Sequence, residues 1–408
     1  MVTPDIGART TKKVEHPATS CRYYASLKWF MTYGWALGVF NSQYDESNGS
    51  ACSIVVAAHR LIGFGIFLFE FLCVIRSFSM LDGLTIGVNM PTAIVLVSIS
   101  YMSMCAGSQA FVLAFQRKLP AMIKKHYENS LKESFDIYGE RSLKIAALLL
   151  TLFCLCSSVL IAATMVLYAY ELVHFPVKFQ MVPGYPAIFV LAVFYFQSSL
   201  SFCTGLYIIM WLISKNGADE LIVEMGAATP RCGVERLSKR YQVLYESVQT
   251  INENFGRFLL FIFGLCLPAV LASVYCLIKD AEADLKMRSV LAIWCATMVG
   301  EQLMLAVPAT ILHERIWEHL YGQAIKDAFF RMYNYTCQKE DDPIKMTQYQ
   351  LFASQLASNG LELSADNFFI VTRSFMLTLV SAVITYFIVI LQFDTSAAPA
   401  VETTTIAH

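Results

Sequence analysis

The sequence predicts an all-α membrane protein with seven transmembrane helices, its N-terminus in the cytoplasm and its C-terminus outside the cell. Three observations support this: the composition, the length of the apolar runs and the distribution of basic residues. Of the 408 residues, 56% are hydrophobic and only 15% are charged, and the mean hydropathy is +0.53. Soluble domains carry about a quarter charged residues. The net charge of −1 argues against a nucleic-acid partner.

Seven apolar runs are long enough to cross a bilayer, which takes about 20 helical residues. They are Ser53–Ile75, Leu84–Phe115, Ile145–Leu172, Tyr185–Ile213, Phe258–Ile278, Val290–Leu312 and Ser374–Phe393. Trp29–Phe40 is also apolar but is too short to cross, which favours a helix lying at the membrane surface. The first 28 residues lack an apolar stretch, so no cleavable signal peptide is expected before the first span.

Basic residues are concentrated on one side of the predicted spans. The segment before span one and the loops after spans two, four and six carry 24 of the 30 Lys and Arg residues. The remaining loops carry 5, and Arg60 lies within span one. Cytoplasmic loops are enriched in Lys and Arg, so the N-terminus is expected in the cytoplasm. This orientation is the reverse of a G-protein-coupled receptor.

Two cytoplasmic segments are predicted to be helical extensions of the spans. After Val234 the apolar residues follow at steps of three and four, which is the seam of a helix that packs against others. This pattern fits a cytoplasmic bundle that continues span five, or an amphipathic helix on the membrane surface. The seam of the first extension is Leu237, Tyr241, Leu244, Val248, Ile251 and Phe255, and that of the second, after span six, is Leu312, Ile316, Leu320 and Ala324.

These expectations divide the chain into seven segments. They are a cytoplasmic N-terminal segment (1–52), spans one to four (53–213), a cytoplasmic helical anchor (214–257), spans five and six (258–312), the rest of the anchor (313–373), span seven (374–393) and an extracellular tail (394–408).

The sequence gives no indication of an enzyme. Most of the twelve cysteines lie inside apolar runs, which indicates buried thiols rather than a disulfide framework. No group of His, Cys, Asp or Glu has the spacing of a metal site, and neither a Gly-rich phosphate loop nor a nucleophile elbow occurs. We therefore expect no metal, no cofactor and no catalytic residues.

The last span contains a specific motif. It reads Thr385-Tyr386, then five apolar residues, then Gln392-Phe393. This motif resembles the one that closes insect gustatory receptors, and the likeness extends through the stretch from Phe352 to Phe393. Ile251-Asn252 and Phe255-Gly256, at the start of span five, are also similar to the pattern of that family.

The resemblance implies a tetrameric, ligand-gated cation channel in which four copies of span seven line the pore. It also implies that the inner extensions form a cytoplasmic anchor and that the ligand enters among the other spans from outside. Two features depart from the family. Phe387 stands where the sugar-receptor subfamily has Glu, which argues against that subfamily, and the tail 394–408 is longer than usual.

The motif residues are the candidate pore and gate. Thr385 and Tyr386 either bond back to their own helix or fix its rotation against a neighbour. Four copies of Phe393 meeting on an axis would exclude water, and outward displacement would expose the Gln392 amides. Phe393 could equally be an interfacial aromatic residue. Asp394 would form a ring of carboxylates at the pore mouth, or a solvated helix end.

The candidate ligand site rests on polar and aromatic residues within the other spans. Ionisable groups inside a membrane are costly and often functional, which singles out Glu301 in span six and also Glu70 in span one. Glu301 either contacts a ligand or makes an internal bond between helices. The ligand-binding candidates are Glu301, Gln302, Trp294, Tyr195, Gln197, Tyr168 and Tyr170.

The function expected from the sequence is a gustatory, chemosensory ion channel in the cell membrane. Its partners would be a small-molecule tastant, membrane lipid, permeant cations and either identical or related subunits. The alternative is a multi-span transporter of a small solute. Transporters often repeat a pattern of broken spans in two halves. We see no such repeat between spans one to three and four to six.

Overall fold

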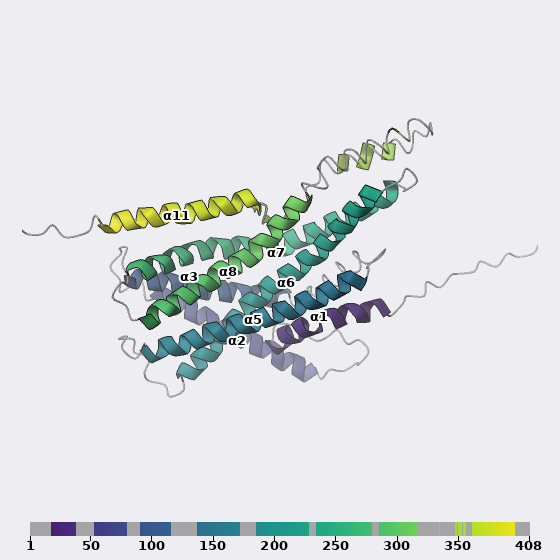
Figure 1. The fold of residues 1–408 in the computed structure, drawn as a ribbon. Helices are drawn as coiled ribbons and strands as arrows, with labels where there is room; N and C mark the ends of the chain where they lie inside the picture. Colours follow the sequence, from purple (N-terminus) through teal and green to yellow (C-terminus); the bar gives the residue numbers. More distant parts are fainter. Residues whose placement is uncertain are drawn as a thin grey trace, which may run out of the picture.

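The computed structural model describes residues 18–37, 53–79, 90–115, 137–171, 185–227, 234–279, 285–316 and 361–395, with 334, 347–348, 350–352 and 354–355. Long helices dominate this part of the chain and pack as an elongated bundle (Figure 1). They are α1 (Ala18–Ala36), α2 (Ser53–Ser79), α3 (Met90–Phe115), α5 (Ile137–Glu171), α6 (Tyr185–Ala227), α7 (Val234–Lys279), α8 (Leu285–Arg315) and α11 (Arg373–Thr395).

Each predicted span corresponds to one of these helices, so the predicted fold class is confirmed. Within the described residues, five helices are long and apolar enough to cross a membrane, namely α3, α5, α6, α7 and α8. Leu61–Ile75 in α2 and Arg373–Val389 in α11 are shorter apolar helices. The predicted start of span two at Leu84 lies outside the described residues.

Many large apolar side chains are exposed on the outside of the bundle. Leu61 is 71% exposed on α2, Leu149 is 59% exposed on α5 and Leu377 is 62% exposed on α11. A soluble protein rarely exposes such extensive apolar surface, whereas lipid solvates it. This surface belongs to a multi-pass membrane protein.

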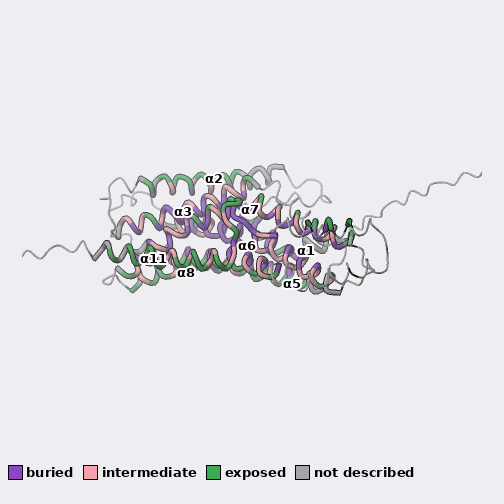
Figure 2. Tube along the Cα trace, turned by 90° about the horizontal axis from the view of Figure 1, so that it is seen from above, coloured by how far each residue is buried: buried purple, intermediate pink, exposed green. Residues whose placement is uncertain are grey.

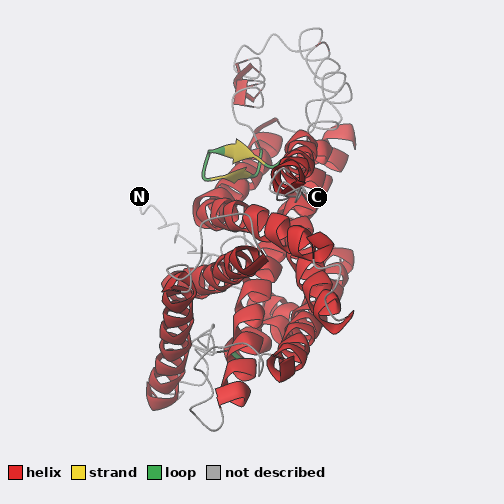
Figure 3. Ribbon diagram, turned by 90° about the vertical axis from the view of Figure 1, so that its left-hand side faces the viewer, coloured by secondary structure: helices red, strands yellow, loops and turns green. Residues whose placement is uncertain are grey.

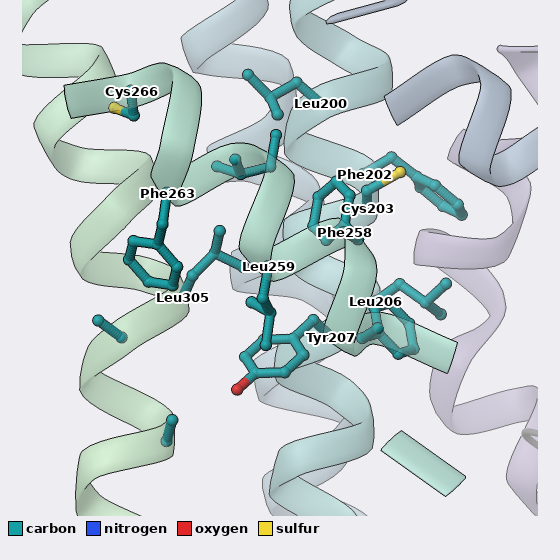
Figure 4. Close-up of a cluster of buried hydrophobic side chains, with 14 of the residues drawn as sticks. Leu200, Phe202, Cys203, Leu206, Tyr207, Phe258, Leu259, Phe263, Cys266 and Leu305 are labelled. Carbon is teal, nitrogen blue, oxygen red and sulfur yellow. The ribbon is translucent and has the colours of Figure 1, made fainter. Parts of the chain in front are cut away.

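Helix α6 occupies the centre of the bundle (Figure 2). It packs against α3, α5, α7 and α8, and Phe202, Tyr207 and Met210 along it are fully buried. The Tyr207 ring of α6 lies 5.8 Å from the Phe255 ring of α7, and Figure 4 shows Tyr207 and Leu259 of α7 in one cluster of buried side chains. Because α6 contacts so many elements, its polar side chains can reach several other helices.

The extension before span five is packed inside the molecule. Val234–Lys279 forms one continuous helix, and all six seam residues from Leu237 to Phe255 are at most 5% exposed. Their burial supports the packed helix over the amphipathic helix on the membrane surface. At the second extension, Leu312 and Ile316 are buried, whereas Leu320 and Ala324 lie outside the described residues.

Helix α1 contains the first part of Trp29–Phe40, the apolar segment that is too short to span, and residues 38–40 lie outside the described part of the chain. Phe30 stacks on Phe202 of α6, with ring centroids 4.7 Å apart. Glycines make room for both rings, since a Cβ at Gly34 would lie 2.4 Å from Phe202 and one at Gly205 would lie 2.8 Å from Phe30. One side of α1 is thus fixed to the bundle, while Trp29 remains 66% exposed.

A small β-hairpin precedes α11, which the all-α prediction did not anticipate (Figure 3). Strands β1 (Ser364–Ala365) and β2 (Phe369–Ile370) pair antiparallel. Asp366 and Asn367 turn the chain with φ values of 51° and 58°, a conformation that Asp and Asn tolerate better than most residues. The strands are two residues each, too short for a pattern of alternating hydrophobicity to indicate them.

The hairpin is fixed to α7 by hydrogen bonds between one α7 side chain and the backbone around β1. The side-chain amide of Asn252 donates from Nδ2 to the Glu362 carbonyl (2.8 Å) and accepts the Ser364 N–H at Oδ1 (2.9 Å). One turn on, a Cβ at Gly256 would lie 2.7 Å from the Asp366 nitrogen. These contacts place the start of α11 relative to α7.

Candidate functional site

A hydrogen-bonded network links three helices around the carboxyl group of Glu301. Ser201 of α6 donates from Oγ to Glu301 Oε1 at 2.6 Å. Gln197, one turn earlier, donates from Nε2 to the same oxygen at 3.1 Å and to Ser201 Oγ at 3.0 Å. Tyr101 of α3 donates its hydroxyl to Gln197 Oε1 at 2.8 Å. All four residues are at most 5% exposed.

The direction of these bonds makes Glu301 the acceptor at the end of the network. Tyr101 donates to Gln197, and Gln197 and Ser201 both donate to Glu301. Its second oxygen, Oε2, is buried and has no hydrogen-bond partner among the described residues, and the same holds for Gln302 Nε2. A buried polar atom without a partner costs about 1–3 kcal/mol. The Thr204 hydroxyl beside Glu301 is likewise without a partner in the described part of the chain, so the network leaves one carboxyl oxygen and two neutral donors unused.

Trp294 joins the network from the side of α8. Its indole lies 6.4 Å from the Tyr101 ring, with the planes 13° apart, and its Nε1 donates to Thr164 Oγ1 of α5 at 2.9 Å. The network therefore draws on α3, α5, α6 and α8.

Serine side chains extend the polar region along α5 and α6. Ser157 Oγ lies 3.0 Å from Ser201 Oγ, and Ser198 donates to Ser158 at 2.8 Å. These serines, Tyr101 and Thr164 are not among the site residues predicted from the sequence. For the serines of α6, the signal was the run Gln197-Ser198-Ser199 followed by Ser201 inside an apolar span.

The structure brings together some of the predicted ligand-binding residues and not others. Glu301 and Gln197 are hydrogen-bonded, and Trp294 contacts the same network through Tyr101. Tyr195 is half-buried and contacts the ring of its neighbour Phe194 at 6.0 Å. The side chains of Tyr168 and Tyr170 lie outside the described part.

Part of the predicted gate can be located on α11, at the edge of the bundle (Figure 1). Thr385 donates from Oγ1 to the Ser381 carbonyl at 2.8 Å, so it bonds back to its own helix. Tyr386 is 56% exposed, and Gln392 is exposed as well. Phe393 and Asp394 belong to the last turns of α11, but their side chains lie outside the described residues.

The comparison with protein families gives a match over nearly the whole chain. A family model described as 7tm Chemosensory receptor matches residues 27–396. The chain is 25% identical over 234 residues to "Gustatory receptor family protein 3" of Caenorhabditis elegans, which covers 55% of this chain and 50% of the relative. It is 29% identical over 159 residues to "High-energy light unresponsive protein 1" of the same organism, covering 38% of this chain and 34% of the relative. The matches thus span half of the first relative and less of the second.

The fold is that of a solved insect olfactory receptor. The structure of OR5 from Machilis hrabei in complex with eugenol superposes with a TM-score of 0.70, covering 91% of this chain and 99% of that receptor at 14% sequence identity. The structure of OR5 described without eugenol gives a TM-score of 0.67 over the same shares of both chains.

Proposed function

The chain belongs to the 7tm chemosensory receptor family, and we propose that it is a gustatory-type receptor that acts as a ligand-gated cation channel. In this proposal four subunits surround a pore lined by α11, and a small organic molecule opens it from a site at the Glu301 network. The N-terminus and the anchor segments lie in the cytoplasm, and the tail after α11 lies outside.

The observation that carries the ligand site is the network itself. Polar side chains of four helices form one network, and two of them donate to a carboxyl group in the interior of a membrane bundle, where such groups are expensive. A purely structural network gains most when each polar atom is paired. Here Glu301 Oε2 and Gln302 Nε2 are without partners among the described residues, and aromatic rings border the network. A ligand with a complementary polar group would supply those partners.

The position of α11 supports the pore assignment. Its apolar side chains are exposed along much of its length, including Val380 at 52% and Ile384 at 54%. In an assembly of four subunits, part of this surface would be covered by neighbouring copies and part by lipid. The olfactory receptor OR5, which has the same fold, binds eugenol, a small aromatic molecule. We expect a ligand of similar size for this chain.

The Glu301→Gln variant tests the ligand site. The glutamine amide keeps one oxygen, which can still accept hydrogen bonds from Ser201 and Gln197. The variant therefore changes mainly the group at the Oε2 position, where an NH2 group replaces the oxygen. The loss of one charged hydrogen bond costs about 1.5–3 kcal/mol, or roughly ten- to a hundredfold in affinity. In membrane current recordings we expect the half-maximal ligand concentration to rise by that factor, with maximal current and surface level retained.

Ser273→Ala is the matched control. Ser273 is fully buried on α7, but its hydroxyl donates only to the Ala269 carbonyl of its own helix in the described structure. The Ser273→Ala receptor should keep the half-maximal ligand concentration of the unmodified receptor. If Glu301→Gln is expressed at the surface and responds at the unchanged concentration, the ligand does not contact this carboxyl group.

A further inference from the structure

Glu70 is a second carboxyl group in the interior of the bundle. It lies on α2, is 0% exposed, and neither of its oxygens has a hydrogen-bond partner among the described residues. None of the ion pairs of these residues involves Glu70 or Glu301. Buried charges in proteins are normally paired, because removal from water costs several kcal/mol per ion. Glu70 therefore lacks the partner that its location requires.

The two carboxyl groups border the same region of the bundle. Helix α2 packs against α3 and α6, the helices whose Tyr101 and Gln197 belong to the Glu301 network. Phe69, the residue before Glu70, lies with its ring 6.2 Å from that of Phe196, which in turn precedes Gln197. Helix α2 thus adds its carboxyl group to the region of the Glu301 network.

The two carboxyl groups present three acceptor oxygens without a hydrogen-bond partner among the described residues, two on Glu70 and one on Glu301. Among the same residues, the donors without a partner beside Glu301, the Gln302 amide and the Thr204 hydroxyl, are uncharged. A protonated amine matches such a set, because it carries a positive charge and two or three N–H donors on one atom. The aromatic rings of Tyr101, Trp294 and Phe196 add surfaces that attract cations and pack against an organic body.

We propose that Glu70 and Glu301 together bind the ammonium group of a small organic amine. This assignment rests on the proposed function, because it names the chemical class of the ligand at the same network. It adds Glu70 of α2 as a binding residue and distinguishes amines from neutral molecules of the same shape.

Two matched probes test the charge directly. 2-Phenylethylamine and 2-phenylethanol share a phenyl ring and an ethyl chain. At neutral pH the first carries an ammonium group where the second carries a hydroxyl group. The full chain in nanodiscs should be stabilised against thermal unfolding by the amine well beyond the alcohol, since a ligand that binds the folded state raises its melting temperature. In Glu70→Gln and in Glu301→Gln, the dissociation constant of the amine should rise roughly tenfold or more, with that of the alcohol little changed.

Glu246→Gln controls for the loss of a carboxylate elsewhere, since Glu246 is exposed on the extension of α7. It should leave the amine-to-alcohol difference unchanged. If both probes change the melting temperature of the unmodified protein equally, the proposal is overturned, even if the variants fail to fold. Replacing sodium by caesium tests an inorganic occupant, and a sodium-dependent melting temperature that is lost in Glu70→Gln would also overturn it.

The outcome is separable from that of the proposed function. Amine binding without current would support the ligand class and contradict the channel. Ligand-gated current with a neutral compound, and no preference for the amine in binding, would support the channel and contradict the amine site.

Discussion

Buried carboxyl and amide groups in this bundle accept hydrogen bonds from uncharged side chains. Glu301 accepts hydrogen bonds from a serine and a glutamine, and Gln109 accepts one from Ser199 at 2.6 Å. Hydrogen bonds between helices in a membrane contribute on the order of 1 kcal/mol each, so several are needed to hold one buried carboxyl group. Single substitutions in this network are therefore expected to change ligand response before they change the fold.

Phe393 is the side chain that we expect to close the pore. If four copies of Phe393 close the pore by excluding water, Phe393→Ala should widen the constriction and give current without ligand. Gln392→Ala should instead lower conductance, because it removes an amide that ions or water meet in the open state. Patch-clamp recording with and without ligand measures both effects.

Val389→Ala is the control on the same helix and should do much less. A cysteine substituted for Phe393 should also form disulfides between subunits under oxidation, as a position on the pore axis requires. If Phe393→Ala reaches the surface, is silent without ligand and responds normally with it, Phe393 is not the gate.

At the scale of elements, short connections determine how the long helices are coupled. Glu224 near the end of α6 pairs with Arg236 and Arg240 of α7. The hairpin before α11 is bonded to α7 through Asn252, and Phe369 of β2 stacks on Phe375 of α11 with centroids 4.2 Å apart. Movement of α7 relative to the bundle would therefore carry the first turn of α11 with it.

Gly256→Ala tests this connection. The new Cβ would lie 2.7 Å from the nitrogen and 3.1 Å from the Cα of Asp366, so the hairpin backbone must shift. Overpacking of this kind costs about 1–3 kcal/mol. In hydrogen–deuterium exchange, the amides of Ser364 and Val371, which bond to Asn252 Oδ1 and the Leu363 carbonyl, should lose protection.

Gly264→Ala is the matched control, because it lies two turns further along α7 and a Cβ there meets nothing within 4 Å. Alanine favours a helix over glycine by about 1 kcal/mol, so this variant should be neutral or slightly stabilising. If the Ser364 amide keeps its protection in Gly256→Ala, the hairpin is not held against α7 in the membrane-embedded protein.

At the scale of the whole molecule, orientation in the membrane follows from the loop charges. Two glycosylation sequons occur, Asn48-Gly49-Ser50 and Asn334-Tyr335-Thr336, and both are predicted to be cytoplasmic. Neither should carry a glycan, because glycosylation acts on the other side of the membrane. Treatment with a glycosidase should leave the electrophoretic mobility of the expressed protein unchanged.

A positive control is available in the tail. Thr403→Asn creates the sequon Asn-Thr-Thr with Thr404 and Thr405, in a segment predicted to lie outside, and should add a glycan. A glycosidase-sensitive shift that disappears in Asn48→Gln or Asn334→Gln would reverse the orientation and contradict the channel proposal.

Local sequence patterns are enough to predict the helices, the membrane location and the family. A span is fixed by the length and apolarity of one continuous segment, and the continuity of α7 follows from helical spacing within a single stretch. These are local properties, so each predicted span overlaps one helix. The limits agree less well, because α5 begins eight residues before span three and α6 continues fourteen residues past span four, to Ala227. The motif from Thr385 to Phe393 is local as well, and the family that it indicates is confirmed.

The contacts between polar groups of different helices depend on the tertiary structure. Tyr101 and Gln197 are 96 residues apart, Gln197 and Glu301 are 104 apart, and Asn252 reaches the hairpin across 110 residues. Such pairs depend on the order of the helices in the bundle and on the rotation of each about its axis. An apolar span has nearly the same hydropathy on every face, so its sequence does not specify that rotation, and the packing of side chains such as Phe30 against Phe202 determines it.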